Sequence, residues 1–285
     1  MGSLYSDYNQ IAQVYDATRV PVGLDFIAQL IKPDQHILDV GCGTGNYISR
    51  LAPVVKKVTG IDHNEEMLKR ARQKMENMNN VELVQGSLLE KLPFDNNTFD
   101  LILINQVLHH LDTDLENYPN TAKFLLEIFR VLRPSGIICI NTCMPDQMDG
   151  FWFMDTIPRV KEECKRRYMG LNKMGQLLAG SGFMNRFRAV AFPEPLQGIK
   201  YFNLLGPLDN IWRLADSKWQ LATDDEVQKA QHDLVELLKM GKLGEYFDGK
   251  DTFRRDKGQT TFVVGQKGGL QVTGEKANSD NIKVI

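Results

Sequence analysis

Short apolar runs alternate, along the first half of the chain, with segments whose apolar residues repeat at helical spacing. The apolar runs predict five strands, at residues 37–40, 57–61, 81–85, 99–105 and 137–142. Between them, Leu68, Ala71 and Met75 share one helix face, and residues 124–132 show the same period. Alternation of strands and helices predicts right-handed crossovers and therefore a parallel, doubly wound α/β sheet.

The second half of the chain is less regular. Residues 171–180 predict a helix, and residues 187–192 and 260–265 predict two further strands, the latter rich in β-branched and aromatic residues. About 65 residues separate these strands, far more than a hairpin needs, and residues 224–240 among them look helical. The pattern therefore predicts a structured insertion at about 193–258 that caps the sheet edge.

Length and composition suit one sizeable domain. Of the 285 residues, 42% are hydrophobic and 25% are charged, so residues 1–267 are expected to form one domain that includes the insertion. Residues 268–285 are rich in Gly, Asn, Lys and Ser and predict a flexible tail.

Charge and cysteine content exclude several classes of protein. The formal net charge of −2 gives no indication of nucleic-acid binding. No apolar run has membrane-spanning length, and the N-terminus lacks the core of a signal peptide. The four cysteines have no metal-type spacing, so we expect a reduced cytoplasmic protein without a metal site.

The segment from His36 to Asp62 carries the strongest chemical signal. A buried strand leads into a glycine-rich turn and a helix start, and the next strand ends in an acid. This order is typical of a nucleoside-cofactor site at the carboxyl ends of parallel strands. Alternating glycines in the turn leave the backbone open to close approach. The turn contains Gly41, Cys42, Gly43 and Gly45.

Position 46 distinguishes between two classes of cofactor. A dinucleotide-binding turn has glycine there, for close packing beneath a pyrophosphate, whereas this chain has Asn46. S-adenosylmethionine (SAM) has no phosphate and suits such a turn better. Asp39, at the strand end, could then hold the ammonium group of SAM, directly or through water. The alternative is a tight turn that binds nothing.

Residues after the next strands are candidates for the rest of the cofactor. Asp62 could accept hydrogen bonds from both ribose hydroxyls, and its alternative role as a helix N-cap falls more naturally to Asn64. Met67 could pack on adenine or belong to the core. The backbone after the third strand could reach the adenine edge, and that after the fourth could lie beside the reactive methyl group. The other candidates in these loops are His63, Ser87, Leu88, Asn105 and Gln106.

Two adjacent histidines follow the fourth strand, which borders the first where the strand order reverses. On a helix, His109 and His110 would point about 100° apart, so that one could face the site as a general base. The other would lie at the surface or in the core. For each histidine alone, a role outside catalysis remains the alternative.

Tyr8, Tyr15 and Arg19 share one face of a predicted N-terminal helix. Placed over the glycine turn, Tyr15 and Arg19 would close the cofactor site. The alternatives are a core tyrosine and a surface ion pair.

Aromatic residues collect in the insertion and after the fifth strand. They could line an acceptor site or favour a cationic acceptor through cation–π contact, although most could instead form the core of the cap. The candidates for acceptor binding are Tyr8, Trp152, Phe153, Tyr201 and Trp212.

Residues 37–142 resemble the class I SAM-dependent methyltransferases, in particular the type 11 group that includes quinone-biosynthesis methyltransferases. The resemblance implies a Rossmann-like seven-stranded sheet of order 3-2-1-4-5-7-6, with the last strand antiparallel, and SAM as the cofactor, released as S-adenosylhomocysteine. The insertion and residues 144–168 depart from the family, so the resemblance does not supply the acceptor. The matching motifs are Asp39–Gly45, Gly60–Asp62, Leu92–Phe94 with Phe99-Asp100, Arg130–Pro134 and Tyr15-Asp-x-x-Arg19.

The expected function is methyl transfer from SAM to a small-molecule acceptor by in-line displacement, aided by proximity and desolvation. The sequence is compatible with O, N, S or C as the accepting atom. One alternative is a SAM-binding regulatory or partner subunit without transfer activity. An arsenite-type methyltransferase is disfavoured, because it would need several thiolates that converge on the site. A nicotinamide oxidoreductase is disfavoured by Asn46. A monomer and a homodimer are both compatible with the sequence.

Overall fold

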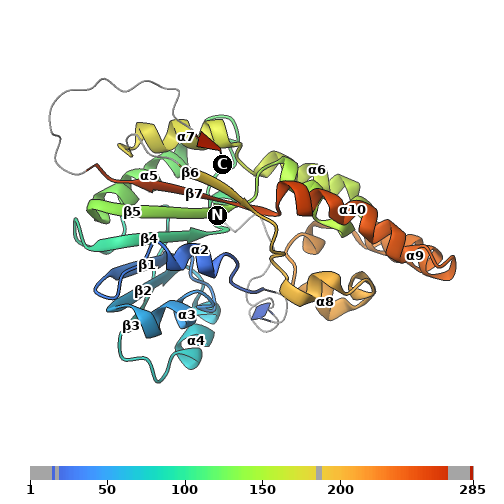
Figure 1. The fold of residues 1–285 in the computed structure, drawn as a ribbon, viewed down its shortest axis with the longest axis horizontal. Helices are drawn as coiled ribbons and strands as arrows, with labels where there is room; N and C mark the ends of the chain where they lie inside the picture. Colours follow the sequence, from blue (N-terminus) through green and yellow to red (C-terminus); the bar gives the residue numbers. More distant parts are fainter. Residues whose placement is uncertain (1–14, 17–18, 184–187, 269–282, 285) are drawn as a thin grey trace. The chain divides into compact units, whose positions relative to one another are not determined.

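The computed structural model describes residues 15–16, 19–183, 188–268 and 283–284 of the chain. The chain divides into two compact units (Figure 1). The sheet unit comprises residues 23–142, 169–190 and 261–285, and the helical unit comprises residues 1–22, 143–168 and 191–260. Tyr8 and most of the predicted tail lie outside the described residues.

The sheet has the order β3-β2-β1-β4-β5-β7-β6-β8 (Figure 1). All neighbouring pairs among the strands β1, β2, β3, β4 and β5 are parallel, and β7 pairs antiparallel with β5. The predicted Rossmann-like sheet of order 3-2-1-4-5-7-6 is therefore confirmed, with the two-residue strand β8 beside β6. The strands are β1 His36–Val40, β2 Lys57–Asp62, β3 Val81–Gln85, β4 Phe99–Asn105, β5 Leu132–Thr142, β6 Arg188–Phe192, β7 Thr260–Gln266 and β8 Lys283–Val284.

Helices fill the connections between the strands of the sheet unit. α4 packs against β2 and β3, and α5 packs against β5 and α7. Asn64 caps α4, because its side chain accepts a hydrogen bond from the backbone N–H of Met67 at 2.9 Å. The elements are α2 Leu24–Ala28, α3 Ile48–Leu51, η1 Ala52–Val54, α4 Glu65–Lys74, η2 Leu108–His110, α5 Pro119–Val131 and α7 Leu171–Gly180.

The central strands are buried on both faces, which explains why they read as apolar runs. Ile37, Leu38 and Val40 on β1 have no exposed surface, and neither have residues 101–104 on β4. Asp39 is the polar exception within the β1 run and is only 2% exposed.

β5 begins earlier than the sequence predicted. Residues 132–136, which precede the predicted strand 137–142, form the irregular start of this strand, where its pairing with β4 shifts between Phe99 and Leu101. Ser135 has a φ of +65° there, and its N–H donates to the carbonyl of Lys267 at 3.0 Å. Pairing with the chain that leaves β7 therefore draws the turn residues into the sheet.

The helical unit combines short 3-10 turns with longer helices around an aromatic core. Phe153 lies at its centre, with its ring 5.2 Å from that of Trp212 and 5.8 Å from that of Trp219, centroid to centroid. The predicted cap, residues 193–258, belongs to this unit, and its role as a substrate cap stays a prediction. The helices are η3 Asp146–Gly150, η4 Trp152–Thr156, α6 Pro158–Arg167, η5 Gly198–Phe202, η6 Gly206–Leu208, α8 Asn210–Leu214, η7 Trp219–Leu221, α9 Asp224–Lys239 and α10 Leu243–Lys257.

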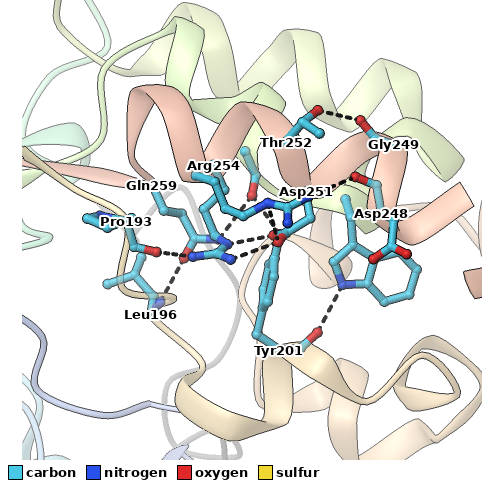
Figure 2. Close-up of polar contacts among 12 residues, drawn as sticks. Pro193, Leu196, Tyr201, Asp248, Gly249, Asp251, Thr252, Arg254 and Gln259 are labelled. Atoms are coloured by element: carbon cyan, nitrogen blue, oxygen red, sulfur yellow. Dashed lines mark hydrogen bonds and ion pairs between the residues drawn. The ribbon is translucent and has the colours of Figure 1, made fainter. Parts of the chain in front are cut away.

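A buried ion pair on α10 joins several of these segments (Figure 2). The carboxylate of Asp251 accepts hydrogen bonds from Arg254, at 2.6 and 2.8 Å, and from the Tyr201 hydroxyl at 2.9 Å. Arg254 also donates to the carbonyl of Pro193. Burial, together with Asp251, raises the pKa of Tyr201, which keeps the phenol neutral.

None of the helices in the described ranges is both long enough and apolar enough to span a membrane.

Candidate active site

Polar residues meet at the carboxyl ends of the parallel strands of the sheet unit. Asp39 on β1 pairs in register with Gly60 on β2 and with Leu103 on β4. Asp62 ends β2, and Asn105 ends β4 opposite Asn141 on β5. The sheet thus brings acids and amides to one edge, where α/β folds bind their ligands.

The glycine-rich turn is fastened to the end of β2. The carboxylate of Asp62 accepts one hydrogen bond from the N–H of Gly43 at 2.8 Å and one from the N–H of Asn64 at 2.9 Å. The N–H groups of Gly41 and Cys42 both donate to the carbonyl of Ile61, at 2.8 and 3.1 Å. Because each carboxylate oxygen can accept a second hydrogen bond, Asp62 keeps acceptor capacity for a ligand.

The three glycines of the turn have left-handed backbone conformations, with φ of +66° at Gly41, +53° at Gly43 and +77° at Gly45. A Cβ at Gly41 would lie 2.4 Å from a methyl of Val107, and one at Gly45 would lie 2.1 Å from the Met75 methyl. A Cβ at Gly43 would meet nothing within 4 Å. Packing against the stiff Val107 side chain therefore demands glycine at position 41, whereas the flexible end of Met75 could move away from a Cβ at position 45. The turn is open at Gly43.

Asp39 is a buried acid with spare bonding capacity. Neither its Oδ2 nor Nδ2 of Asn105 has a hydrogen-bond partner of good geometry among the described residues. Burial raises the pKa of Asp39 to about 7, and nearby Asp62 adds to the rise although Asn105 favours the ionised form. Asp39 thus changes charge near neutral pH.

The two histidines do not point apart as predicted. They lie in the single 3-10 turn η2 rather than in an α-helix, and their ring centroids are 4.0 Å apart with an interplanar angle of 41°. His109 is 8% exposed and His110 is half-buried. The two rings therefore lie in contact and tilted against each other, and a catalytic role for either stays a prediction.

Asn141 lies at the same edge, opposite Asn105, and is a candidate site residue that the sequence analysis missed. It is 1% exposed, and its backbone carbonyl accepts a hydrogen bond from the backbone N–H of Gln106 at 2.8 Å. Gln106 has a φ of +55°, so this contact holds an unusual backbone conformation directly after β4. A single polar residue within the apolar run of the fifth strand was the available signal.

The remaining cofactor candidates occupy the surrounding loops. Met67 is 2% exposed, His63 lies with its Nδ1 3.5 Å from the Asp62 carboxylate, and the Ser87 hydroxyl accepts from the N–H of Leu89. Leu88 is half-buried. Burial, with Asp39 and Asp62 nearby, raises the pKa of the Cys42 thiol. Cofactor contacts of all these residues stay predictions.

Arg19 makes an ion pair inside the helical unit. Its Nη1 lies 3.2 Å from Oδ2 of Asp216, and the Asp216 side chain is fully buried, so the pair is not the surface contact considered as an alternative. Tyr15 is half-buried. Whether Tyr15 and Arg19 close the cofactor site stays a prediction.

The aromatic acceptor candidates pack in the core of the helical unit. All four described members are at most 3% exposed. Their polar atoms have internal partners, because the indole N–H groups of Trp152 and Trp212 donate to the carbonyls of Tyr201 and Lys200 at 3.0 and 3.1 Å. Acceptor binding by these residues stays a prediction. The four are Trp152, Phe153, Tyr201 and Trp212.

The chain is similar in sequence to known methyltransferases. A family profile described as a methyltransferase domain matches residues 38–140. The demethylmenaquinone methyltransferase of Listeria welshimeri is 31% identical over 177 residues, which cover 54% of this chain and 72% of the relative. The Staphylococcus aureus enzyme of the same name is 33% identical over 177 residues, with coverage of 54% and 70%.

A solved structure gives the same fold. The protein comes from an antibiotic biosynthesis pathway of Anabaena variabilis and is described as a methyltransferase. It superposes with a TM-score of 0.71 at 21% identity, covering 87% of this chain and 99% of its own. Relatives above 30% identity match over more than two thirds of their own length, and the sheet has the strand order that the family resemblance implies. The chain therefore belongs to the class I SAM-dependent methyltransferases.

Proposed function

We propose that this methyltransferase binds SAM at the carboxyl edge of β1, β2 and β4 and transfers its methyl group to a small-molecule acceptor. The observation that carries the proposal is the buried Oδ2 of Asp39, which has no hydrogen-bond donor among the described residues and lies at the end of β1, next to the glycine turn. A buried carboxylate oxygen without a donor is costly, so the site favours a ligand that brings one.

The residues at this edge fit the amino-acid and ribose parts of SAM. Asp39 would accept from an ammonium group, and Asp62 would accept from ribose hydroxyls with the lone pairs that the backbone leaves free. The open side of Gly43 would allow close approach to the backbone. When bound, SAM supplies a methyl group activated by its sulfonium centre.

The protein's own contribution would be positioning and exclusion of water. Asn105, which ends β4, and the following Gln106 would lie beside the methyl group of SAM. An acceptor held in line with that methyl group, with water excluded, would then be positioned for transfer. His109 or His110 would serve as a general base only for an acceptor that carries a proton at neutral pH, such as a hydroxyl or an ammonium group.

SAM affinity is expected to depend on pH through Asp39. With a pKa of about 7, Asp39 is protonated in acid, and binding an ammonium group must then first remove that proton. Affinity for S-adenosylhomocysteine should rise about tenfold per pH unit up to neutral pH and level off above it. Isothermal titration across this range measures the slope. The Asp39→Asn variant should bind weakly and without that slope, whereas an unchanged slope would remove Asp39 from the ammonium contact.

Turnover is tested with methyl-labelled SAM and a panel of small acceptors. A quinol belongs in the panel because the two curated relatives are named for demethylmenaquinone. With a hydroxyl acceptor, His110→Gln or His109→Gln should lower the rate about 100-fold if that ring is the base, with unchanged affinity for S-adenosylhomocysteine. Wild-type rates in both variants would exclude a histidine base. Tight cofactor binding without any product would instead support a SAM-binding partner subunit.

A further inference from the structure

Exposed apolar side chains gather on one segment of the helical unit. Five of them lie within residues 199–214, on η5, on α8 and in the chain between these helices. Ile199 is 80% exposed and Ile211 is 58% exposed. Single exposed apolar residues are normal, but a contiguous group of them marks a surface that binds a partner. The five residues, called the apolar patch below, are Ile199, Phe202, Leu205, Ile211 and Leu214.

Local geometry holds the parts of the apolar patch together. Its first two residues are one turn apart on the 3-10 helix η5, and its last two are one turn apart on α8, so each pair shares a helix face. The indole N–H of the buried Trp212 on α8 donates to the carbonyl of Lys200 on η5 at 3.1 Å. A Cβ at Gly206 would lie 2.5 Å from the Trp212 ring, and α8 packs on η6. These three helices therefore meet around one buried tryptophan.

The apolar patch has few charges around it, and two of them are opposite in sign. Residues 198–214 contain three charged side chains, those of Lys200, Asp209 and Arg213. Arg213 is engaged within its own segment, where Nη1 donates to the carbonyl of Pro207 at 2.7 Å. Lys200 and Asp209 are exposed, and neither forms an ion pair with any residue that the structure describes. The surface therefore offers a cation on η5 and an anion at the start of α8.

We propose that the apolar patch is the interface between two copies of this chain related by a two-fold axis. A surface with one cation and one anion is complementary to itself. A two-fold axis that runs between Lys200 and Asp209 brings each of them beside the opposite charge of the second copy. The apolar side chains of both copies would be buried at the centre, where interfaces are poor in charge. This interface goes beyond the proposed methyl transfer and does not depend on it.

A lipid surface fits the apolar patch less well than a second copy does. Segments that lie on membranes surround their apolar residues with Lys and Arg, which meet anionic headgroups. Here a carboxylate lies directly beside an exposed apolar residue, because Oδ1 of Asp209 accepts from the backbone N–H of Ile211 at 2.8 Å. Anionic headgroups would repel this carboxylate, whereas Lys200 of a second copy would attract it.

Sedimentation velocity of the full chain tests the interface. At micromolar concentration the wild type should sediment with twice the chain mass of 32.4 kDa. Ile211→Asp should weaken dimerisation at least about 100-fold, because the loss of a central apolar contact occurs twice in a two-fold interface. Leu126→Asp is the matched control, since Leu126 is 54% exposed on α5 of the sheet unit. That variant should dimerise like the wild type.

The charge pairing has a signature of its own. Lys200→Glu places a like charge against Asp209 of the second copy, so dimerisation should weaken at least about tenfold. Added salt screens this repulsion and should therefore strengthen the dimer of the variant. Lys123→Glu, at an exposed lysine of α5, should leave dimerisation unchanged. Lys200→Glu also decides the question of the interface if Ile211→Asp does not fold.

Four results would overturn the proposal. A wild type that sediments as a monomer at every concentration has no such interface. A dimer that tolerates Ile211→Asp as well as Leu126→Asp would use another surface. A dimer of Lys200→Glu as tight as the wild type would exclude the two-fold charge pairing. A monomer that binds phosphatidylglycerol vesicles, and loses that binding in Ile211→Asp, would make the apolar patch a lipid surface.

Discussion

Asp251→Ala is expected to lower the free energy of unfolding by about 3–5 kcal/mol, because it leaves the Arg254 guanidinium buried without its carboxylate. The side chains of this pair are 5% and 9% exposed. The substitution also removes an acceptor of the Tyr201 hydroxyl. Thermal unfolding of the full chain measures the loss. In the variant, we expect the helical unit alone to unfold at a lower temperature than in the wild type.

Asp248→Ala is the matched control, since Asp248 lies on the same helix and its side chain is exposed. That variant should unfold within about 0.5 kcal/mol of the wild type, as surface substitutions usually do. If Asp251→Ala unfolded like Asp248→Ala, the ion pair on α10 would not hold the helical unit together.

Asp62→Asn is expected to weaken binding of S-adenosylhomocysteine about 10- to 100-fold, the range for a lost hydrogen bond to a charged group. Both carboxylate oxygens of Asp62 accept from backbone N–H groups, those of Gly43 and Asn64. An amide has only one oxygen and cannot replace both acceptors. In either orientation the new NH₂ group would face one of these donors. The variant therefore disturbs both the ribose contact and the glycine turn.

Asp100→Asn separates the two effects. Asp100 also accepts from a backbone N–H, that of His36 at 2.8 Å, but it lies near the start of β4, at the opposite edge of the sheet. Titration should give wild-type affinity for Asp100→Asn and weakened affinity for Asp62→Asn, with similar circular dichroism. Equal affinities in the two variants would place the cofactor elsewhere.

The strands were predictable because parallel strands buried on both faces must be apolar throughout. β3 and β4 have the predicted bounds, and the polar residues Asp39 and Asp62 stood out at the strand ends. The start of β5 was not predictable, because Pro134, Ser135 and Gly136 read as a turn and only pairing with distant Lys267 makes them part of the sheet.

Side-chain orientation and long-range pairing limited the prediction of the site. Three residues cannot reveal whether His109 and His110 lie on an α-helix or in a 3-10 turn, and the contact between their rings depends on side-chain orientations that the sequence does not show. Arg19 and Asp216 are 197 positions apart, so no local pattern indicates that they pair. The sequence also cannot distinguish an aromatic residue that packs in the core from one that lines a binding site.

Titration of the purified chain with S-adenosylhomocysteine tests the central claim most directly. Micromolar or tighter binding at one site per chain, weakened in Asp62→Asn and unchanged in Asp100→Asn, is the predicted result. Absence of binding at neutral pH, or equal affinity in all three proteins, would contradict the assignment of the cofactor to the edge formed by Asp39, Asp62 and the glycine turn.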